Sequence, residues 1–140
     1  MAQHFLQPTE DIPGTPATIL IIENDRNNRI LMENLLHLGG YNFISASDGQ
    51  EALAALNRGE HVDLVLTDLS MPGLDGYKVA QLIRSRPGYE QVPIVAVTAS
   101  AMSGDREYAL AHGCTDYLTK PFPPGKLLEV VARLLKQASR

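Results

Sequence analysis

The sequence has a single cysteine, widely separated histidines and no long apolar run, and each of these shortages excludes a class of protein. Cys114 alone can form neither an intrachain disulfide nor a thiolate metal cage. The four histidines lack the close spacing of a zinc site. No stretch approaches the ~18 consecutive apolar residues of a membrane span, and the first residues do not resemble a secretory signal. We therefore expect a cytoplasmic protein.

Basic clusters are also lacking, because lysine and arginine are scattered along a chain whose formal net charge is −4. This gives no electrostatic reason to bind nucleic acid or an anionic membrane, so we expect neither as a partner. Apolar residues make up 44% of the composition and charged residues 20%, which is typical of a globular protein. A length of 140 residues fits one domain of ordinary size.

The chain divides into a short leader and one domain. Prolines and a glycine crowd residues 1–16 without apolar periodicity, which predicts a flexible leader followed by a domain over residues 17–140. In that domain, apolar β-branched runs alternate with helical patterns. Strands are predicted over residues 18–23, 41–46, 62–68, 93–99 and 116–119, each followed by a helical pattern.

This alternation predicts an α/β fold of the doubly wound (βα)5 type, a five-stranded parallel sheet with helices on both faces. Continuous apolar runs such as ILII and IVAV are what strands buried on both faces require. In such sheets the ligand site lies beyond the carboxyl ends of the strands. Functional side chains should therefore directly follow strands.

Polar residues do gather at the predicted strand ends. They are Glu23, Asn24 and Asp25 after the first strand, Asp68 after the third, Thr98 after the fourth and Lys120 after the fifth. Converging carboxylates call for a hard cation with oxygen ligands, Mg²⁺ or Ca²⁺. A hydroxyl and an ammonium beside them would bind an anion. Together these groups predict a phosphoryl-transfer site in which the Asp68 carboxylate is the nucleophile and becomes an acyl phosphate.

At this point the sequence resembles the receiver domain of response regulators, the CheY-like family of two-component signalling. The resemblance rests on the motif D-x-x-M-P-G-x-D-G over residues 68–76, with Thr98-Ala99 and Lys120-Pro121 following at the family's spacing. It implies the flavodoxin-like strand order 2-1-3-4-5. It also implies a cis peptide bond between Lys120 and Pro121.

The resemblance assigns a role to each site residue. It makes Asp68 the phosphoacceptor, Glu23 and Asn24 part of the pocket for Mg²⁺ or Mn²⁺, Ser70 a metal ligand through its backbone carbonyl, Lys120 the cation that pairs with phosphate, Thr98 the switch hydroxyl and Tyr117 the aromatic switch residue. As an alternative, Tyr117 is only a half-buried strand residue.

Asn24 departs from the family pattern, which usually has a second acid here as a direct metal ligand. An amide oxygen still coordinates a hard cation but carries no charge, so we expect weaker Mg²⁺ binding. Asp25 follows directly, and as a hypothesis it restores the charge by reaching the metal itself or through a water.

The favoured function is a signalling switch that accepts a phosphoryl group on Asp68 from a histidine kinase or a histidine phosphotransfer protein. It then acts by contact with a downstream protein, and the family also allows a homodimer that forms on phosphorylation. Because nothing follows Arg140, we expect a single-domain regulator, although a receiver excised from a hybrid histidine kinase would look almost the same.

A pseudo-receiver that docks constitutively, with phosphorylation impaired by Asn24, is the competing hypothesis. We do not expect an enzyme beyond the domain's own phosphotransfer and autodephosphorylation. A haloacid dehalogenase would place its nucleophile after the first strand, with a second aspartate where this chain has Ser70. The glycine-rich motifs of nucleotide-binding folds are missing from the sequence.

Overall fold

The computed structural model describes residues 16–69, 76–99 and 105–138. Its strands are β1 (Thr18–Ile22), β2 (Asn42–Ala46), β3 (Leu64–Asp68), β4 (Ile94–Thr98) and β5 (Asp116–Thr119). Its helices are α1 (Arg26–Leu38), α2 (Gly49–Asn57), α3 (Gly76–Arg84), α4 (Asp105–Ala111) and α5 (Pro124–Ala138). The predicted leader lies outside the described residues except for residue 16.

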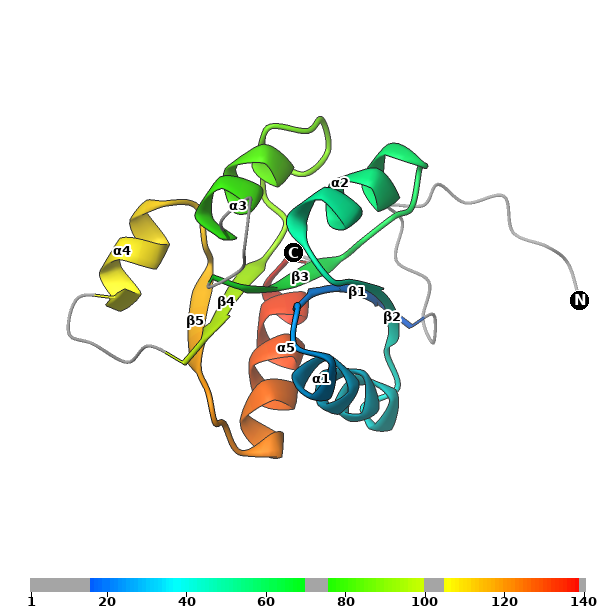
Figure 1. Ribbon diagram of the computed structural model, residues 1–140, viewed down its shortest axis with the longest axis vertical. Helices are drawn as coiled ribbons and strands as arrows, with labels where there is room; N and C mark the ends of the chain where they lie inside the picture. Colours follow the sequence, from blue (N-terminus) through cyan, green and yellow to red (C-terminus); the bar gives the residue numbers. More distant parts are fainter. Residues whose placement is uncertain (1–15, 70–75, 100–104, 139–140) are drawn as a thin grey trace, which may run out of the picture.

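The strands form one parallel sheet in the order β2-β1-β3-β4-β5, which confirms the predicted fold. In Figure 1, α1 and α5 lie on one side of this sheet and α2 and α3 lie on the other. The register pairs Asp68 with Val97, and Thr98 with Thr119. The carboxyl ends of β3, β4 and β5 therefore meet at the same edge of the sheet.

The core has two halves, because successive residues of each strand face opposite sides of the sheet. In β1, Ile19 and Ile21 pack against α1 and α5, whereas Leu20 and Ile22 pack against α2 and α3. All four side chains are fully buried. The same double burial in β3 and β4 explains why β1, β3 and β4 read as largely apolar runs rather than as alternating ones.

The ends of the elements differ from the prediction by one or two residues. The predicted third strand began at residue 62, but β3 begins at Leu64. The Asp63 carboxylate before it accepts a hydrogen bond of 2.8 Å from the Thr18 amide. In the described residues, no helix combines the length and the apolar character needed to cross a bilayer.

Candidate functional site

Three charged side chains meet at the carboxyl edge of the sheet. Asp68 is the last residue of β3, Glu23 directly follows β1, and Lys120 directly follows β5. The Lys120 Nζ donates to Glu23 Oε1 at 2.8 Å and lies 3.5 Å from Asp68 Oδ2. Glu23 is fully buried and Asp68 is 5% exposed, so the ammonium balances two carboxylates that water barely reaches. The expectation that these three residues would converge is met.

The position of Lys120 is fixed by both its backbone and its charge. Its amide donates to the Thr98 carbonyl at 2.7 Å, and its peptide bond to Pro121 is cis, as the resemblance implied. Burial by itself lowers the pKa of Lys120, but the hydrogen bond to Glu23 and the charge of Asp68 outweigh burial and raise it. The ammonium therefore stays protonated between the two carboxylates.

Glu23 is held from two sides. Its Oε1 accepts from Lys120, and its Oε2 accepts a hydrogen bond of 3.0 Å from the Asp25 amide. Burial raises the pKa of the Glu23 carboxyl, although the hydrogen bonds from Lys120 and from the Asp25 amide oppose this shift. The Arg29 guanidinium also donates to the Glu23 carbonyl at 2.9 Å. Sequence reasoning did not single out Arg29, because only the turn of α1 brings it back to this loop.

Asn24 and Asp25 both lie exposed between β1 and α1. Asp25 is the N-cap of α1, where its Oδ2 accepts a hydrogen bond of 2.9 Å from the Asn28 amide. This capping role was not foreseen, since Asp25 was considered only as a substitute metal ligand. One of its oxygens is thus already engaged by the helix, and whether it reaches a metal stays a prediction.

The two expected switch residues lie on neighbouring strands. Thr98 ends β4 and is 2% exposed, while Tyr117 lies in β5 and is half-buried. The register places Tyr117 beside Ala96, two residues before Thr98. Their roles in switching stay predictions. Ser70, expected to offer a backbone carbonyl, lies outside the described residues.

The oxygen donors at this edge fit a small hard cation. They are the carboxylates of Asp68 and Glu23, and the exposed Asn24, which directly follows Glu23 in the chain, carries an amide oxygen. Mg²⁺ commonly binds through only one or two carboxylates and keeps several waters, so this donor set suits it. In the described ranges, no group of three or more histidine, cysteine, aspartate or glutamate side chains is arranged to hold a metal. Within these ranges, the carboxylates at this edge are thus fewer than a dedicated metal cage would have.

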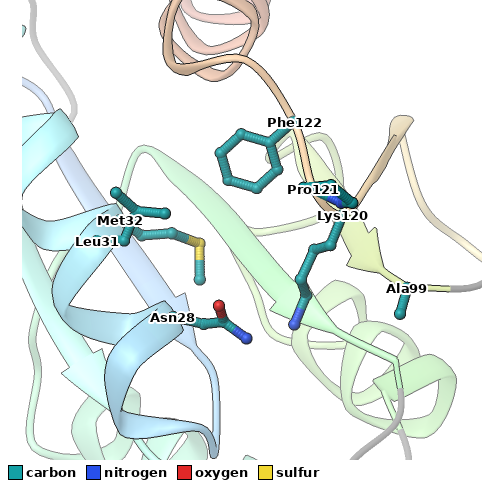
Figure 2. A pocket seen from close by; sticks show the side chains of 7 residues that line it. All are labelled: Asn28, Leu31, Met32, Ala99, Lys120, Pro121 and Phe122. Carbon is teal, nitrogen blue, oxygen red and sulfur yellow. The ribbon is translucent and has the colours of Figure 1, made fainter.

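A cavity of about 340 Å³ adjoins the charged cluster (Figure 2). Asn28 and Met32 project into it from α1, and Lys120 and Phe122 face them from the segment after β5. Its full lining is Asn28, Leu31, Met32, Ala99, Lys120, Pro121 and Phe122. Lys120 is common to the cavity and the carboxylate cluster, so the two share a wall.

Comparison with known proteins identifies this arrangement. The family model of the response regulator receiver domain matches residues 19–132. The chain belongs to the response regulator receiver domains. The residues that carried the resemblance all lie inside the matched range, and the domain is thus part of two-component signalling. Receiver domains generally bind Mg²⁺ in the active site, which agrees with the oxygen donors found here.

Relatives of known sequence include both long and short proteins. The "Probable transcriptional regulator ycf27" of Porphyridium aerugineum is 40% identical over 122 residues, covering 87% of this chain and 49% of the relative. The "Polar-differentiation response regulator DivK" of Brucella ovis is 33% identical over 121 residues, covering 86% of this chain and 98% of the relative. The chain thus spans about half of the first protein and nearly all of the second.

Two solved structures extend the comparison. The receiver domain of the sensor histidine kinase PA1611 from Pseudomonas aeruginosa is 35% identical with a TM-score of 0.79, over 87% of this chain and 99% of that one. Its structure is described with a magnesium ion coordinated in the active site cleft. The chemotaxis protein CheY4 of Vibrio cholerae is 28% identical with a TM-score of 0.80, over 86% of this chain and 99% of that one.

Proposed function

We propose that the protein is a phosphorylation-driven switch in which Asp68 accepts a phosphoryl group from a histidine kinase or a histidine phosphotransfer protein. The observation that carries the proposal is the buried cluster of Glu23, Asp68 and Lys120. Lys120 Nζ lies 3.5 Å from Asp68 Oδ2, within reach of the oxygens of a phosphoryl group bonded to this carboxylate. An ammonium at that position would neutralise charge that the transfer brings in.

The transfer exchanges one bond to phosphorus for another. A carboxylate oxygen of Asp68 attacks phosphorus while the N–P bond of the donor's phosphohistidine breaks, and the imidazole nitrogen keeps the electron pair and takes up a proton. In the reverse direction of the switch, water attacks phosphorus and the bond to Asp68 breaks, releasing inorganic phosphate. A bound Mg²⁺ or Mn²⁺ would supply charge neutralisation for the phosphoryl oxygens. Asp68, Glu23 and Asn24 are the residues that would hold it.

The proposal includes the switch itself. Phosphate on Asp68 would attract the Thr98 hydroxyl, and Tyr117 would move inward with it, so that the surface of α4, β5 and α5 changes its affinity for a downstream protein. The protein would not be an enzyme that turns over a separate substrate. Its cytoplasmic location and a homodimer formed on phosphorylation also stay predictions.

The test is direct phosphorylation by a small donor. The protein is incubated with acetyl phosphate and Mg²⁺, and its intact mass is measured. We expect a gain of one phosphoryl group in the natural sequence and none in Asp68→Asn, whose amide is a poor nucleophile. If the natural protein gains no mass, or if Asp68→Asn gains as much, Asp68 is not the phosphoacceptor.

Asn24 supports a second candidate, a pseudo-receiver that docks without phosphorylation. An uncharged amide stands where the family usually has an acid, and Mg²⁺ affinity depends on ligand charge. Titration calorimetry of Mg²⁺ distinguishes the two functions. We expect Asn24→Asp to bind Mg²⁺ on the order of tenfold more tightly, and Asp25→Asn more weakly if Asp25 compensates. A natural protein that neither binds Mg²⁺ nor accepts phosphate would favour the pseudo-receiver.

Exposed apolar side chains beside the charged cluster support the proposal that the phosphoryl donor is a protein and not only a small molecule. On α1, Ile30 is 39% exposed and Leu31 is 46% exposed, and Leu31 also lines the cavity that reaches Lys120. An apolar side chain of a donor helix would bury surface here while its phosphohistidine faced Asp68.

A protein donor can be separated from a small one by a single variant. Leu31→Glu should slow phosphotransfer from the kinase that phosphotransfer profiling selects, and should leave the acetyl phosphate reaction unchanged. Equal transfer by the kinase to Leu31→Glu and to the natural protein would remove this surface from the proposal.

More than one protein context fits the proposal. DivK is matched over nearly its whole length, the ycf27 regulator over about half of its length, and PA1611 is a sensor histidine kinase that contains a receiver domain. In each context Asp68 would be the same acceptor. The contexts differ in whether the donor is a separate protein or part of the same chain.

A further inference from the structure

Gly76, the first residue of α3, lies in unusually close contact with the phosphoacceptor strand. A Cβ atom built on Gly76 would lie 2.6 Å from the backbone oxygen of Asp68 and 2.7 Å from Leu69 Cα. It would also lie 2.9 Å from Leu69 Cδ2. Because two of these three atoms belong to the backbone, a change of rotamer cannot relieve the contact. Any side chain at this position therefore requires the chain itself to move.

We propose that Gly76 is a positioning residue for Asp68. Its lack of a side chain lets the first turn of α3 lie directly on the backbone of Asp68 and Leu69, and this contact holds the Asp68 carboxylate in place opposite Lys120. The inference deepens the proposed function and rests on it, because positioning matters only if Asp68 accepts phosphate.

The helix has little freedom to move away from an added side chain. Gly76, Val79, Ala80 and Ile83 of α3 are all buried, and the last three belong to the same core half as Val65 of β3. Asp68 is the end of its strand, where it pairs with Val97, and Leu69 lies just beyond β3 and is half-buried. The displacement would therefore fall on the backbone of Asp68 and Leu69, next to the reacting carboxylate.

The size of the displacement follows from the contact distances. Ordinary van der Waals contact begins near 3.4 Å, so an oxygen 2.6 Å away would have to retreat by about 0.8 Å. Lys120 Nζ already lies 3.5 Å from Asp68 Oδ2, at the outer limit of a hydrogen bond. Misplacement of a reacting group by ~1 Å can slow a reaction on the order of a hundredfold.

Backbone conformation does not explain the need for glycine here. Among the described glycines, those with positive φ are Gly40, Gly59, Gly88 and Gly113, and Gly76 is not one of them. A helix is normally less stable with glycine than with alanine at an interior position. Helix propensity alone therefore predicts that Gly76→Ala is harmless or stabilising, which is the opposite of what the contact with Asp68 predicts.

The experiment compares Gly76→Ala with two glycine-to-alanine controls. Gly125→Ala lies in the first turn of α5, where an added Cβ meets nothing within 4 Å. Gly39→Ala is crowded too, at 2.8 Å from Leu128 Cδ2, but this residue caps the far end of α1. For each protein we would measure the rate of acetyl phosphate labelling by intact mass, the Mg²⁺ dissociation constant before labelling, and the thermal midpoint.

We expect Gly76→Ala to be labelled more slowly, on the order of tenfold to a hundredfold, while Gly125→Ala matches the natural protein. The Mg²⁺ dissociation constant of Gly76→Ala should also rise, which a purely structural role of Gly76 would not produce. Gly39→Ala, whose added Cβ meets only side-chain atoms, should change neither the labelling rate nor the Mg²⁺ dissociation constant, whatever its effect on the thermal midpoint. If Gly76→Ala is poorly folded, the series is repeated in trimethylamine N-oxide, which favours compact states.

A folded Gly76→Ala protein with the natural labelling rate and natural Mg²⁺ affinity would overturn the inference. So would a loss of rate in Gly39→Ala as large as in Gly76→Ala, because stability alone would then account for both. Failure of the natural protein itself to accept phosphate refutes the proposed function instead. The Mg²⁺ comparison would still decide whether Gly76 shapes the site around Asp68.

Discussion

Removing the ammonium of Lys120 should destabilise the protein strongly in the absence of metal. The pair of Lys120 Nζ and Glu23 Oε1 is 2.8 Å long, the Glu23 side chain is fully buried and the Lys120 side chain is 17% exposed. Breaking a buried ion pair by deleting one partner costs about 3–5 kcal/mol, because an uncompensated charge remains. Lys120→Met would leave the Glu23 carboxylate as such an uncompensated buried charge.

We expect a loss of about 3 kcal/mol in the free energy of unfolding, at the lower end of that range. Two features limit the loss. The Asp25 amide still donates to Glu23 Oε2 at 3.0 Å, and the buried carboxyl, whose pKa burial already raises, can take up a proton. Glu23→Gln should cost less than Lys120→Met, because the ammonium keeps Asp68 as a partner at 3.5 Å.

The assay is urea unfolding followed by far-ultraviolet circular dichroism at neutral pH in EDTA, so that no divalent ion contributes. Combining Glu23→Gln with Lys120→Met should recover stability relative to Lys120→Met alone, with a coupling energy of about 1–3 kcal/mol. Lys136→Met, at an exposed position in the last turn of α5, is the matched control and should stay within about 0.5 kcal/mol of the natural protein.

The pH dependence of the stability loss in Lys120→Met tests independently whether an uncompensated Glu23 carboxylate causes it. In Lys120→Met the folded-state pKa of Glu23 would lie above its unfolded value, so the penalty is complete at high pH and disappears as the pH falls below the unfolded value. The reasoning is refuted if Lys120→Met is as stable as the natural protein at neutral pH and the coupling energy is indistinguishable from zero.

Three further predictions concern groups outside the site. The buried Asp116 carboxylate bridges Arg106 at 3.0 Å and Arg133 at 2.8 Å. Burial raises its pKa, but these partners outweigh burial and lower it, so its stabilisation is present above the ordinary value of 3.8 and is lost as pH falls through the folded-state pKa. Acid unfolding of Asp116→Asn should therefore show a shallower pH dependence than that of the natural protein, and an identical curve would contradict this. Burial raises the pKa of Cys114 to about 11, so a disulfide reagent should label the native thiol slowly at pH near 8 and label the urea-unfolded thiol rapidly. Arg84 donates to the Gly113 carbonyl at 2.9 Å and to Thr115 Oγ1 at 3.0 Å, so Arg84→Met should lose about 2 kcal/mol in urea unfolding, and a loss below about 0.5 kcal/mol would refute it.

The fold and the convergence of the charged residues were predictable because they depend on pattern rather than on distance. Apolar runs buried on both faces predict a parallel sheet, and parallel strands bring their carboxyl ends to one edge. Any polar residue directly after such a strand must reach that edge, which is why Glu23, Asp68 and Lys120 could be grouped from the sequence. Their chemistry followed from the residue types alone.

Distances, by contrast, were not predictable. The sequence placed Lys120 near both carboxylates but could not show that its shorter contact is with Glu23 rather than with Asp68. Asp25 was considered only as a metal ligand, and only the path of the chain shows that it caps α1. The bridge from Asp116 to Arg106 and Arg133 joins three elements whose side chains no local pattern relates.

The charge at the site links the departure at Asn24 to the choice between the two candidate functions. Glu23 and Asp68 contribute two carboxyl groups and Lys120 one ammonium, and an acid at position 24 would add a third carboxyl group directly after Glu23 in the chain. With Asn24 we expect less repulsion between the carboxylates of the metal-free site, so that the fold would depend less on a cation and would bind it less tightly. A pseudo-receiver would benefit from a fold that depends less on a cation, and weaker cation binding would not affect its docking. A working switch must tolerate weaker cation binding. Lys120 already contacts both carboxylates before any phosphate arrives. Its ammonium therefore supplies part of the positive charge that an acid at position 24 would have helped to bind as a cation.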